Sequence, residues 1–154
     1  MDIGDLLERQ AILPRINATS KRHALGVIAE TAARLYGVKA SDVTEALTQR
    51  EQRGSTGVGF GVALPHGRIK GLDRPRGVFA RLETPIAFDA VDDQPVDLIF
   101  ALLTPVDAQA DHLRALARVA RAFRRTKLRE QLRQGRTQDA LHAFLVQEAH
   151  STAA

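Results

Sequence analysis

Residues 50–68 read Arg50-Glu51-Gln52-Arg53-Gly54-Ser55-Thr56-Gly57-Val58-Gly59-Phe60-Gly61-Val62-Ala63-Leu64-Pro65-His66-Gly67-Arg68. From residue 54 to residue 67 this segment contains five glycines among small and apolar residues. Apolar side chains alternate through its centre with the period of a β-strand. Glycines inside or beside a strand mark tight turns and close backbone approaches. We therefore predict a strand at 54–67 that is entered and left by glycine turns.

Two helices are predicted upstream of this strand. Ser20 is a favoured N-cap residue, and Gly37 can end a helix in the left-handed conformation. Between them, apolar residues recur at helical spacing: Leu25, Ile28, Ala29, Ala32 and Leu35. Ser41 is the next candidate N-cap, for a helix that ends between residues 50 and 53.

Downstream, further strands give way to helices. Residues 77–82 and 85–88 are predicted to be extended, and the apolar run 96–103 predicts a central strand buried on both faces. A helical pattern follows, with arginines opposite an apolar face formed by Leu113, Leu116, Ala120 and Phe123. Thr126 and Thr137 are candidate N-caps of two more helices.

The order of helices, strands and helices predicts an α/β fold in which helices cover a β-sheet, without a regular βαβ repeat. A chain of 154 residues fits one domain. We expect this domain at residues 1–148 and a disordered tail at residues 149–154.

Composition narrows the function classes. The chain has no cysteine, which excludes disulfides and thiolate chemistry and fits a reducing cytoplasm. No apolar run is as long as a membrane span. The acidic start of the chain also lacks the positive charges of an export signal. We therefore expect a cytoplasmic protein without membrane insertion.

Several features of residues 50–68 predict an anion site. Glycines let backbone N–H groups approach a ligand closely, and Ser55 and Thr56 add hydroxyl groups. Arg50 and Arg68 could form charge-assisted hydrogen bonds to phosphate oxygens. A Walker A pattern is missing, so nothing here supports nucleotide binding directly.

His66 is the candidate nucleophile of this segment. Neutral imidazole is nucleophilic at physiological pH. Pro65 stiffens the approach to His66, and Gly67 leaves it sterically uncovered. Taken alone, a Pro-His-Gly turn is more often only a tight corner, and a lone histidine is usually a polar surface or core residue.

A family resemblance favours the functional interpretation. The segment resembles the active-site signature of the IIA proteins of the bacterial phosphotransferase system, in its mannitol, fructose and nitrogen branch. Residues 82–90, Leu-Glu-Thr-Pro-Ile-Ala-Phe-Asp-Ala, and 94–98, Gln-Pro-Val-Asp-Leu, resemble the nitrogen type in particular. Asp111-His112-Leu113 resembles that family's second histidine motif. The resemblance extends from about residue 5 to 145 and implies a three-layer α/β/α fold with a mixed sheet.

The resemblance also implies a role for each residue. His66 would accept a phosphoryl group at Nε2 from a phosphorylated carrier, HPr or its nitrogen-branch relative NPr. His112 would orient the acceptor or hydrogen-bond the phosphoryl oxygens, and Arg50 would neutralise phosphate charge. Phosphate-binding positions would be Ser55, Thr56, Gly67 and Arg68. Phe60 departs from the family, which commonly has Asn there.

The expected function is that of a regulatory phosphocarrier of the nitrogen phosphotransferase system, and not of a free-standing metabolic enzyme. Its phosphorylation state would govern target proteins such as potassium-transport or sensor-kinase systems. The alternative is a sugar-specific IIA component, of fructose or mannitol type, that passes phosphate to a IIB domain. A binding module with an inactive site is a third possibility. We expect no cofactor.

Residues 114–136 form a basic stretch, with eight arginines and one lysine against the single acid Glu130. A solvated helix face is the first interpretation, docking of an acidic partner the second, and nucleic-acid binding the third. The stretch lacks a helix-turn-helix pattern, and the chain has one Tyr and no Trp for base stacking.

Neither His23, His142 nor His150 has a companion motif. We predict no metal site, because zinc-like histidine spacing is missing and Asp92-Asp93 resembles a solvated turn.

Overall fold

The computed structural model describes residues 2–153, with side chains for residues 2–147. In chain order its elements are α1 (Ile3–Leu6), the 3₁₀ turn η1 (Arg9–Ala11), β1 (Ile12–Ile16), α2 (Lys21–Tyr36), α3 (Ala40–Gln52), β2 (Gly57–Gly59), β3 (Val62–Ala63), β4 (His66–Arg68), β5 (Arg76–Ile86), β6 (Val96–Thr104), α4 (Gln109–Phe123), α5 (Thr126–Gln134) and α6 (Gln138–Ala153).

The strands form one mixed sheet in the order β1-β5-β6-β3-β2, and β4 pairs with β6 beyond the end of β3. β6 runs antiparallel to β5 and parallel to both β3 and β4. It is therefore flanked on both sides, as the continuous apolar run at 96–103 predicted.

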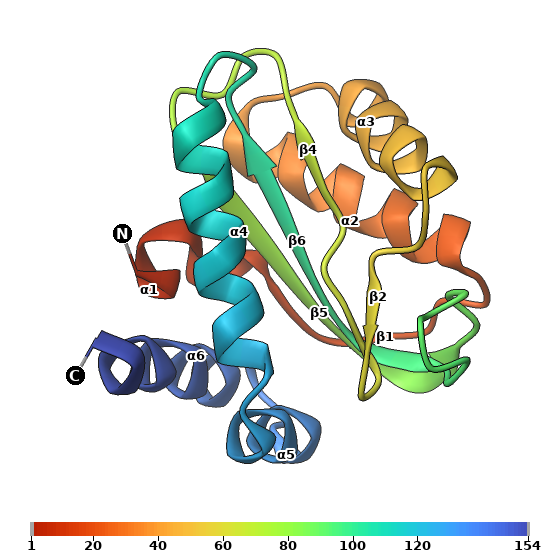
Figure 1. Ribbon diagram of the computed structural model, residues 1–154, viewed down its shortest axis with the longest axis vertical. Coiled ribbons are helices and arrows are strands. Elements are labelled where there is room, and N and C mark those ends of the chain that lie inside the picture. The colour runs from red at the N-terminus through yellow and green to blue at the C-terminus, as the bar shows by residue number, and fades with distance from the viewer. Residues whose placement is uncertain (1, 154) are drawn as a thin grey trace.

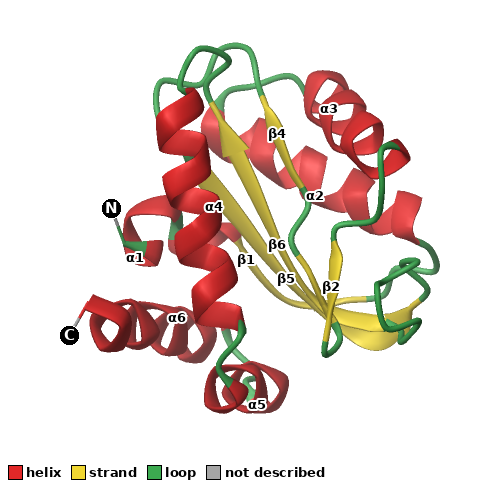
Figure 2. Cartoon of the chain, viewed as in Figure 1, coloured by secondary structure: helices red, strands yellow, loops and turns green. Residues whose placement is uncertain are grey.

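The helices lie on both faces of this sheet (Figures 1 and 2). On one face α2 packs on β5 and α3 on β4, whereas on the other α4 packs on β6 and α6 on β1. This arrangement confirms the predicted three-layer α/β/α fold with a mixed sheet.

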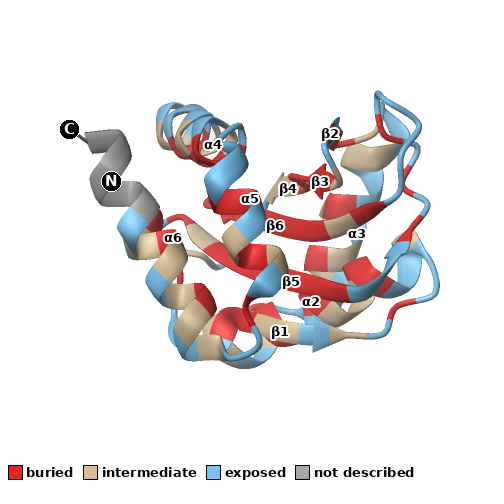
Figure 3. Cartoon of the chain, turned by 90° about the horizontal axis from the view of Figure 1, so that it is seen from below, coloured by how far each residue is buried: buried red, intermediate tan, exposed pale blue. Residues whose placement is uncertain are grey.

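Buried residues concentrate on β5, β6 and the inner sides of the helices (Figure 3). The Phe123 ring lies 6.1 Å from the Phe79 ring and 5.9 Å from the Phe100 ring, so α4 is fixed to both central strands by aromatic packing. The position of α4 matters for the site, because His112 lies in its first turn.

The helix caps show where local sequence signals succeed. Ser20 caps α2 by accepting a hydrogen bond from the His23 N–H at 3.1 Å, and Gly37 ends α2 with a φ of 70°. Thr137 accepts from the Ala140 N–H at 3.1 Å. The predicted caps Ser41 and Thr126 were wrong, because both lie inside their helices, which start after Lys39 and Arg125.

The strand predictions need three corrections. The single strand expected at 54–67 is three short strands, since the chain turns back between β2 and β3. The piece at 77–82 and the first two residues of the piece at 85–88 are parts of one strand, β5, which ends at Ile86. β1 was missed. It contains Pro14, which argues against a central strand, but β1 lies at the sheet edge where Pro is tolerated.

Leu113 was predicted on the apolar face of α4, yet it is 59% exposed. Helix α6 continues to Ala153, and the tail expected at 149–154 lies outside the side chains that the structure describes. None of the described helices is both long and apolar enough to cross a membrane.

Candidate active site

The two histidines singled out by the sequence meet at the carboxyl end of β6. Strand β4 starts at His66 and lies parallel to the last residues of β6, with His66 opposite Leu102. After β6 the chain turns into α4, whose first turn carries His112. The His66 and His112 ring centroids are 5.4 Å apart. The carboxyl ends of parallel strands are common binding sites in α/β folds.

Both histidines line a cavity of about 600 Å³. Its other walls come from α3, β4 and the second turn of α4: Ala46, Gln49, Arg50, Arg53, Gly67, Arg68, Leu113 and Leu116. The cavity therefore has three arginines and no carboxylate among its lining residues, which suits an anion.

The hydrogen bonds of His66 determine which nitrogen is free to react. Its Nδ1 lies 2.9 Å from the Leu64 carbonyl oxygen, which can only accept, so Nδ1 carries the proton. Its Nε2 accepts a hydrogen bond from Arg50 Nε at 3.2 Å. Both contacts require the same tautomer, in which Nδ1 is protonated and Nε2 is not. Nε2 is therefore the ring nitrogen that has a lone pair.

Arg50 is placed by the C-terminal turn of α3. Its Nη1 donates to the Gly54 carbonyl at 2.8 Å, while its Nε reaches His66. The guanidinium is thus held at two points and presents a charge at the nucleophile.

His112 is buried and is held by a buried threonine. Its Nδ1 lies 2.6 Å from Thr104 Oγ1 at the end of β6. Thr104 is completely buried, so its hydroxyl has no access to solvent. The bond fixes the His112 ring relative to β6, and hence relative to β4 and His66.

The surroundings favour the neutral form of both rings. Burial lowers the pKa of His66 below its usual 6.5, and the Arg50 charge adds to this, although the bond to Leu64 acts in the opposite direction. Burial also lowers the pKa of His112, followed by the charges of His66 and Arg68. Neutral imidazole at His66 is the nucleophilic form.

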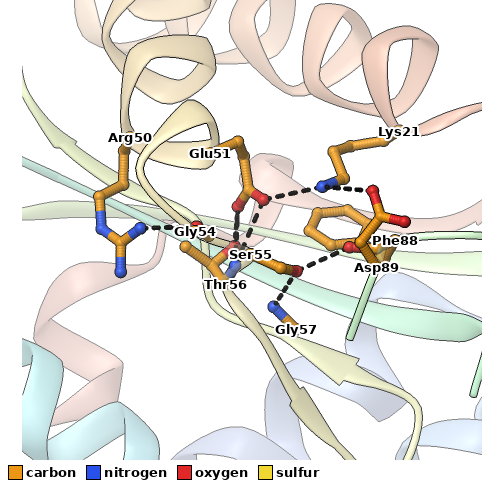
Figure 4. Close-up of polar contacts among 9 residues, drawn as sticks. All are labelled: Lys21, Arg50, Glu51, Gly54, Ser55, Thr56, Gly57, Phe88 and Asp89. Carbon is orange, nitrogen blue, oxygen red and sulfur yellow. Dashed lines mark hydrogen bonds and ion pairs between the residues drawn. The ribbon is translucent and has the colours of Figure 1, made fainter. Parts of the chain in front are cut away.

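Ser55 and Thr56 lie close to this site but do not line its cavity. The Ser55 hydroxyl donates to the Phe88 carbonyl at 2.6 Å and accepts from the Gly57 N–H at 3.0 Å. The Thr56 hydroxyl donates to the Glu51 carboxylate, on the side of α3 away from Arg50 (Figure 4). Their predicted contact with phosphate is therefore not supported by this geometry, which instead shows them organising the loop.

Phe60 also lies outside the cavity. It occupies the turn between β2 and β3 with a φ of 59° and is 66% exposed. Its ring lies 4.4 Å from the guanidinium carbon of Arg129. The departure from the family's Asn therefore does not change the polarity of the cavity.

The basic stretch is not a simple solvated face. Arg129 is buried and donates to the Phe123 carbonyl at 2.8 Å. Arg133 pairs with Asp97 at 3.0 Å. These two arginines fasten α5 to α4 and to the start of β6, and so they have structural roles that the sequence analysis missed.

Other site residues escaped the sequence analysis too. Thr104 could have been noticed as a polar residue at the end of a buried apolar run. Leu64 acts through its backbone, and Gln49 and Arg53 reach the cavity only because α3 packs on β4.

Among the described residues, no group of three or more His, Cys, Asp or Glu side chains could hold a metal ion. A second cavity, of about 680 Å³, lies between α2 and α3 and is lined by neither site histidine.

Comparison with known proteins then identifies the family. Residues 5–148 match the family model described as phosphoenolpyruvate-dependent sugar phosphotransferase system, EIIA 2. The chain belongs to this EIIA 2 family. The family match agrees with the resemblance carried by residues 50–68, and it covers both histidines.

Within the EIIA 2 family the chain is of the nitrogen regulatory type. It is 48% identical over 145 residues to the nitrogen regulatory protein of Bradyrhizobium diazoefficiens, covering 94% of this chain and 95% of that one. The crystal structure of nitrogen regulatory protein IIA-Ntr from Neisseria meningitidis superposes with a TM-score of 0.87 at 37% identity, covering 93% and 98% of the two chains.

A more distant EIIA structure shares the fold. The complex of enzyme IIA for mannitol with phosphorylated enzyme IIB from Escherichia coli matches with a TM-score of 0.78 at 19% identity, covering 92% of this chain and 99% of that chain.

Proposed function

We propose that this protein is a regulatory phosphocarrier, in which His66 Nε2 accepts a phosphoryl group from phosphorylated HPr or NPr. The observation that carries the proposal is the tautomer and surroundings of His66. Its Nδ1–H donates a hydrogen bond to the Leu64 carbonyl, and its Nε2 lies beside Arg50 in an arginine-lined cavity. A cytoplasmic location follows from the proposed donors.

The transfer is a displacement at phosphorus between two imidazoles. The P–N bond of the donor's phosphohistidine breaks, and a P–Nε2 bond to His66 forms. The donor imidazole takes back the electron pair of its broken bond. His66 keeps its Nδ1 proton throughout, and the hydrogen bond to the Leu64 carbonyl stabilises the positive charge that develops on the imidazole.

Charge spreads over the three equatorial oxygens of the phosphoryl group during this transfer. Arg50 is placed to donate to these oxygens once Nε2 bonds phosphorus, and Arg68 adds positive charge at the cavity wall. Gly67 offers no side chain that would obstruct the group.

His112 would be a second donor to the phosphoryl oxygens. If Thr104 donates to its Nδ1, the His112 proton lies on Nε2 and is available to the cavity. Ser55 and Thr56, which we first assigned to phosphate binding, support the loop that precedes His66.

The regulatory role is favoured over the sugar-specific one by the nitrogen regulatory names of its relatives. Phosphorylation would change the charge and hydrogen-bonding capacity around the cavity and so alter partner binding. Potassium-transport and sensor-kinase systems are the expected targets. The alternative, transfer to a IIB domain of a fructose or mannitol system, would use the same His66.

The test is a reconstituted transfer from phosphoenolpyruvate through enzyme I and either HPr or NPr, followed by intact mass measurement. We expect one acid-labile phosphate adduct that disappears in His66→Ala. A faster reaction with NPr would support the nitrogen branch, and a faster one with HPr the sugar branch. A folded protein that gains no phosphate from either donor would rule out the proposal.

A further inference from the structure

Glu51 follows Arg50 directly on the last turn of α3 but has no part in the function proposed so far. Consecutive helical residues point about 100° apart. Arg50 accordingly reaches into the His66 cavity, whereas Glu51 points toward α2 and the segment after α3 (Figure 4). Its side chain is only 6% exposed, so a carboxylate is buried here.

Three donors satisfy this carboxylate. Lys21 Nζ lies 3.0 Å from Oε2, the Thr56 N–H lies 3.1 Å from Oε1, and the Thr56 hydroxyl donates to Oε1 as well. The Lys21 ammonium is itself placed over the Phe88 ring, 4.6 Å from its centroid. A buried charge with this many partners indicates a specified arrangement, because each lost partner would leave a costly unsatisfied group.

The backbone continues from this carboxylate to His66. The Thr56 carbonyl accepts a hydrogen bond from the Leu64 N–H at 3.0 Å. The Leu64 carbonyl in turn accepts from His66 Nδ1 at 2.9 Å. Thr56 and Leu64 are thus each held through their N–H and each hold the next group through their C=O.

The series closes on itself through Arg50. His66 Nε2 accepts from Arg50 Nε, and Arg50 is bonded covalently to Glu51. The ring of contacts therefore runs from Glu51 through Thr56, Leu64 and His66 to Arg50, and it holds both nitrogens of the imidazole.

We propose that Glu51 is a positioning residue which, through Thr56 and Leu64, holds His66 in the Nδ1-protonated tautomer and keeps Arg50 against its nucleophilic nitrogen. This role rests on the proposed function of His66. Lys21 holds the carboxylate in place through their ion pair at 3.0 Å. Glu51 itself does not touch the phosphoryl group.

A carboxylate is required because all three partners donate. Glu51→Gln keeps the size of the side chain but presents an amide NH₂ to at least one of these donors. Lys21 then loses its counter-charge, and either Lys21 or the two Thr56 donors face the NH₂ in place of an acceptor. The segment before Leu64 is then free to shift. A displacement of about 1 Å at a reacting group can reduce the rate on the order of 10²-fold.

The first experiment measures the tautomer of His66 in the unphosphorylated protein from the ¹⁵N shifts of its ring. We expect the Nδ1-protonated form in the wild type and a mixture with the Nε2-protonated form in Glu51→Gln. Glu30→Gln is the matched control, since Glu30 is an exposed carboxylate on the neighbouring helix α2. It should leave the His66 shifts unchanged.

The second experiment follows transfer from the phosphorylated donor. We expect Glu51→Gln to lower kcat on the order of 10²-fold with little change in KM, because the docking surface is intact. Unchanged ring shifts and an unchanged kcat, with only a lower melting temperature, would overturn the proposal and leave Glu51 as a structural ion pair.

A second variant pair guards against a Glu51→Gln protein that does not fold. Thr56→Val removes only the hydroxyl donor and should shift the tautomer in the same direction, whereas Thr56→Ser should restore the wild-type shifts. Equal ¹⁵N shifts in Thr56→Val and Thr56→Ser would contradict the proposed series of contacts from Glu51 to His66. If wild-type protein accepted no phosphate at all, the proposed function would fail, while the ring shifts would still decide the positioning role.

Discussion

Arg50 donates its Nε–H, at 3.2 Å, to the same His66 nitrogen that would bond phosphorus. In the resting protein the guanidinium therefore occupies the lone pair of the proposed nucleophile. Its second contact, from Nη1 to the Gly54 carbonyl at 2.8 Å, does not involve His66. Arg50 can thus keep its hydrogen bond to Gly54 while its Nε–H exchanges one acceptor, the imidazole nitrogen, for another, a phosphoryl oxygen.

Replacing Arg50 by lysine should separate the contribution of its positive charge from that of its hydrogen-bond geometry. Lysine keeps the positive charge but cannot contact Gly54 and the phosphoryl group with one planar fork. We expect the rate of phosphoryl transfer to His66 to fall by about 10²- to 10³-fold, the loss typical of one preorganised donor to a developing anion. Rapid-quench measurement of phosphohistidine formation checks this.

Arg53→Lys is the control for that variant, because Arg53 lines the same cavity and acts on His66 through its charge, without a described hydrogen bond to it. Its effect should be much smaller. Equal losses in the two variants would show that only the total charge of the cavity matters.

The lowered pKa values of His66 and His112 predict a pH dependence of stability. The unfolded chain takes up protons near pH 6.5, whereas the folded chain resists this until a lower pH. Between these values the unfolded state binds more protons, so the free energy of unfolding falls as pH falls. Above about pH 6.5 both states are neutral and the dependence from these groups vanishes.

Urea denaturation between pH 7.5 and pH 5 would measure this dependence. His66→Gln and His112→Gln should each flatten it, since each removes one group that is held neutral. His23→Gln is the comparison, because that histidine lies at the start of α2 away from the cavity. A slope unchanged by both site substitutions would contradict the assignment.

The sequence alone predicted the layers and most of the helices, because amphipathic periodicity and the caps at Ser20 and Thr137 are local signals. It missed β1, since Pro14 is disfavoured in a central strand and nothing local reveals that β1 is an edge. It also merged three short strands into one, because the turn back between β2 and β3 is stabilised by distant partners. Phe60, for example, donates its N–H to Asp92 at 3.1 Å.

For the candidate site, the sequence predicted that His66, His112 and Arg50 belong to one site, but it did not predict all of their contacts. His66, His112 and Arg50 do converge. Ser55 and Thr56 were assigned to phosphate because their hydroxyls stand beside the glycines and because of the family resemblance, but their hydroxyls turn the other way. That direction depends on Glu51 and Phe88, which meet this loop only after α3 and the end of β5 have packed.

The turn at Phe60 should owe part of its stability to Arg129. A non-glycine residue at a φ of 59° is strained, which costs about 1–2 kcal/mol. The contact of its ring with the buried Arg129 guanidinium offsets part of this cost. A double-mutant cycle of Phe60→Ala and Arg129→Gln, measured by urea denaturation, should give a coupling free energy of about 0.5–1 kcal/mol, because the Phe60 ring is largely exposed.

Val58→Ala provides a matched cycle with Arg129→Gln, because Val58 is an exposed apolar neighbour on β2 with no ring. Its coupling to Arg129 should be near zero. A Phe60 cycle that is also near zero would mean that the hydrogen bonds to Asp92 and Arg133 alone hold the turn.

Gly67 sets the distance between α3 and β4, and hence between Arg50 and His66. A Cβ added at Gly67 would lie 3.0 Å from the Ala46 Cβ, closer than normal van der Waals contact. Gly67→Ala should therefore push α3 outward and stretch the bond from Arg50 to His66. We expect a stability loss of about 1–3 kcal/mol, and a loss of transfer rate up to the order of 10²-fold.

The double variant Gly67→Ala/Ala46→Gly distinguishes this displacement from a direct effect on phosphate binding. Removing the Ala46 Cβ makes room for the new methyl group, although glycine within α3 costs about 1 kcal/mol of helix stability. The transfer rate should recover while the free energy of unfolding does not. Failure of the rate to recover would show that the methyl group obstructs the cavity itself, and that Gly67 serves the phosphoryl group and not the spacing of the two elements.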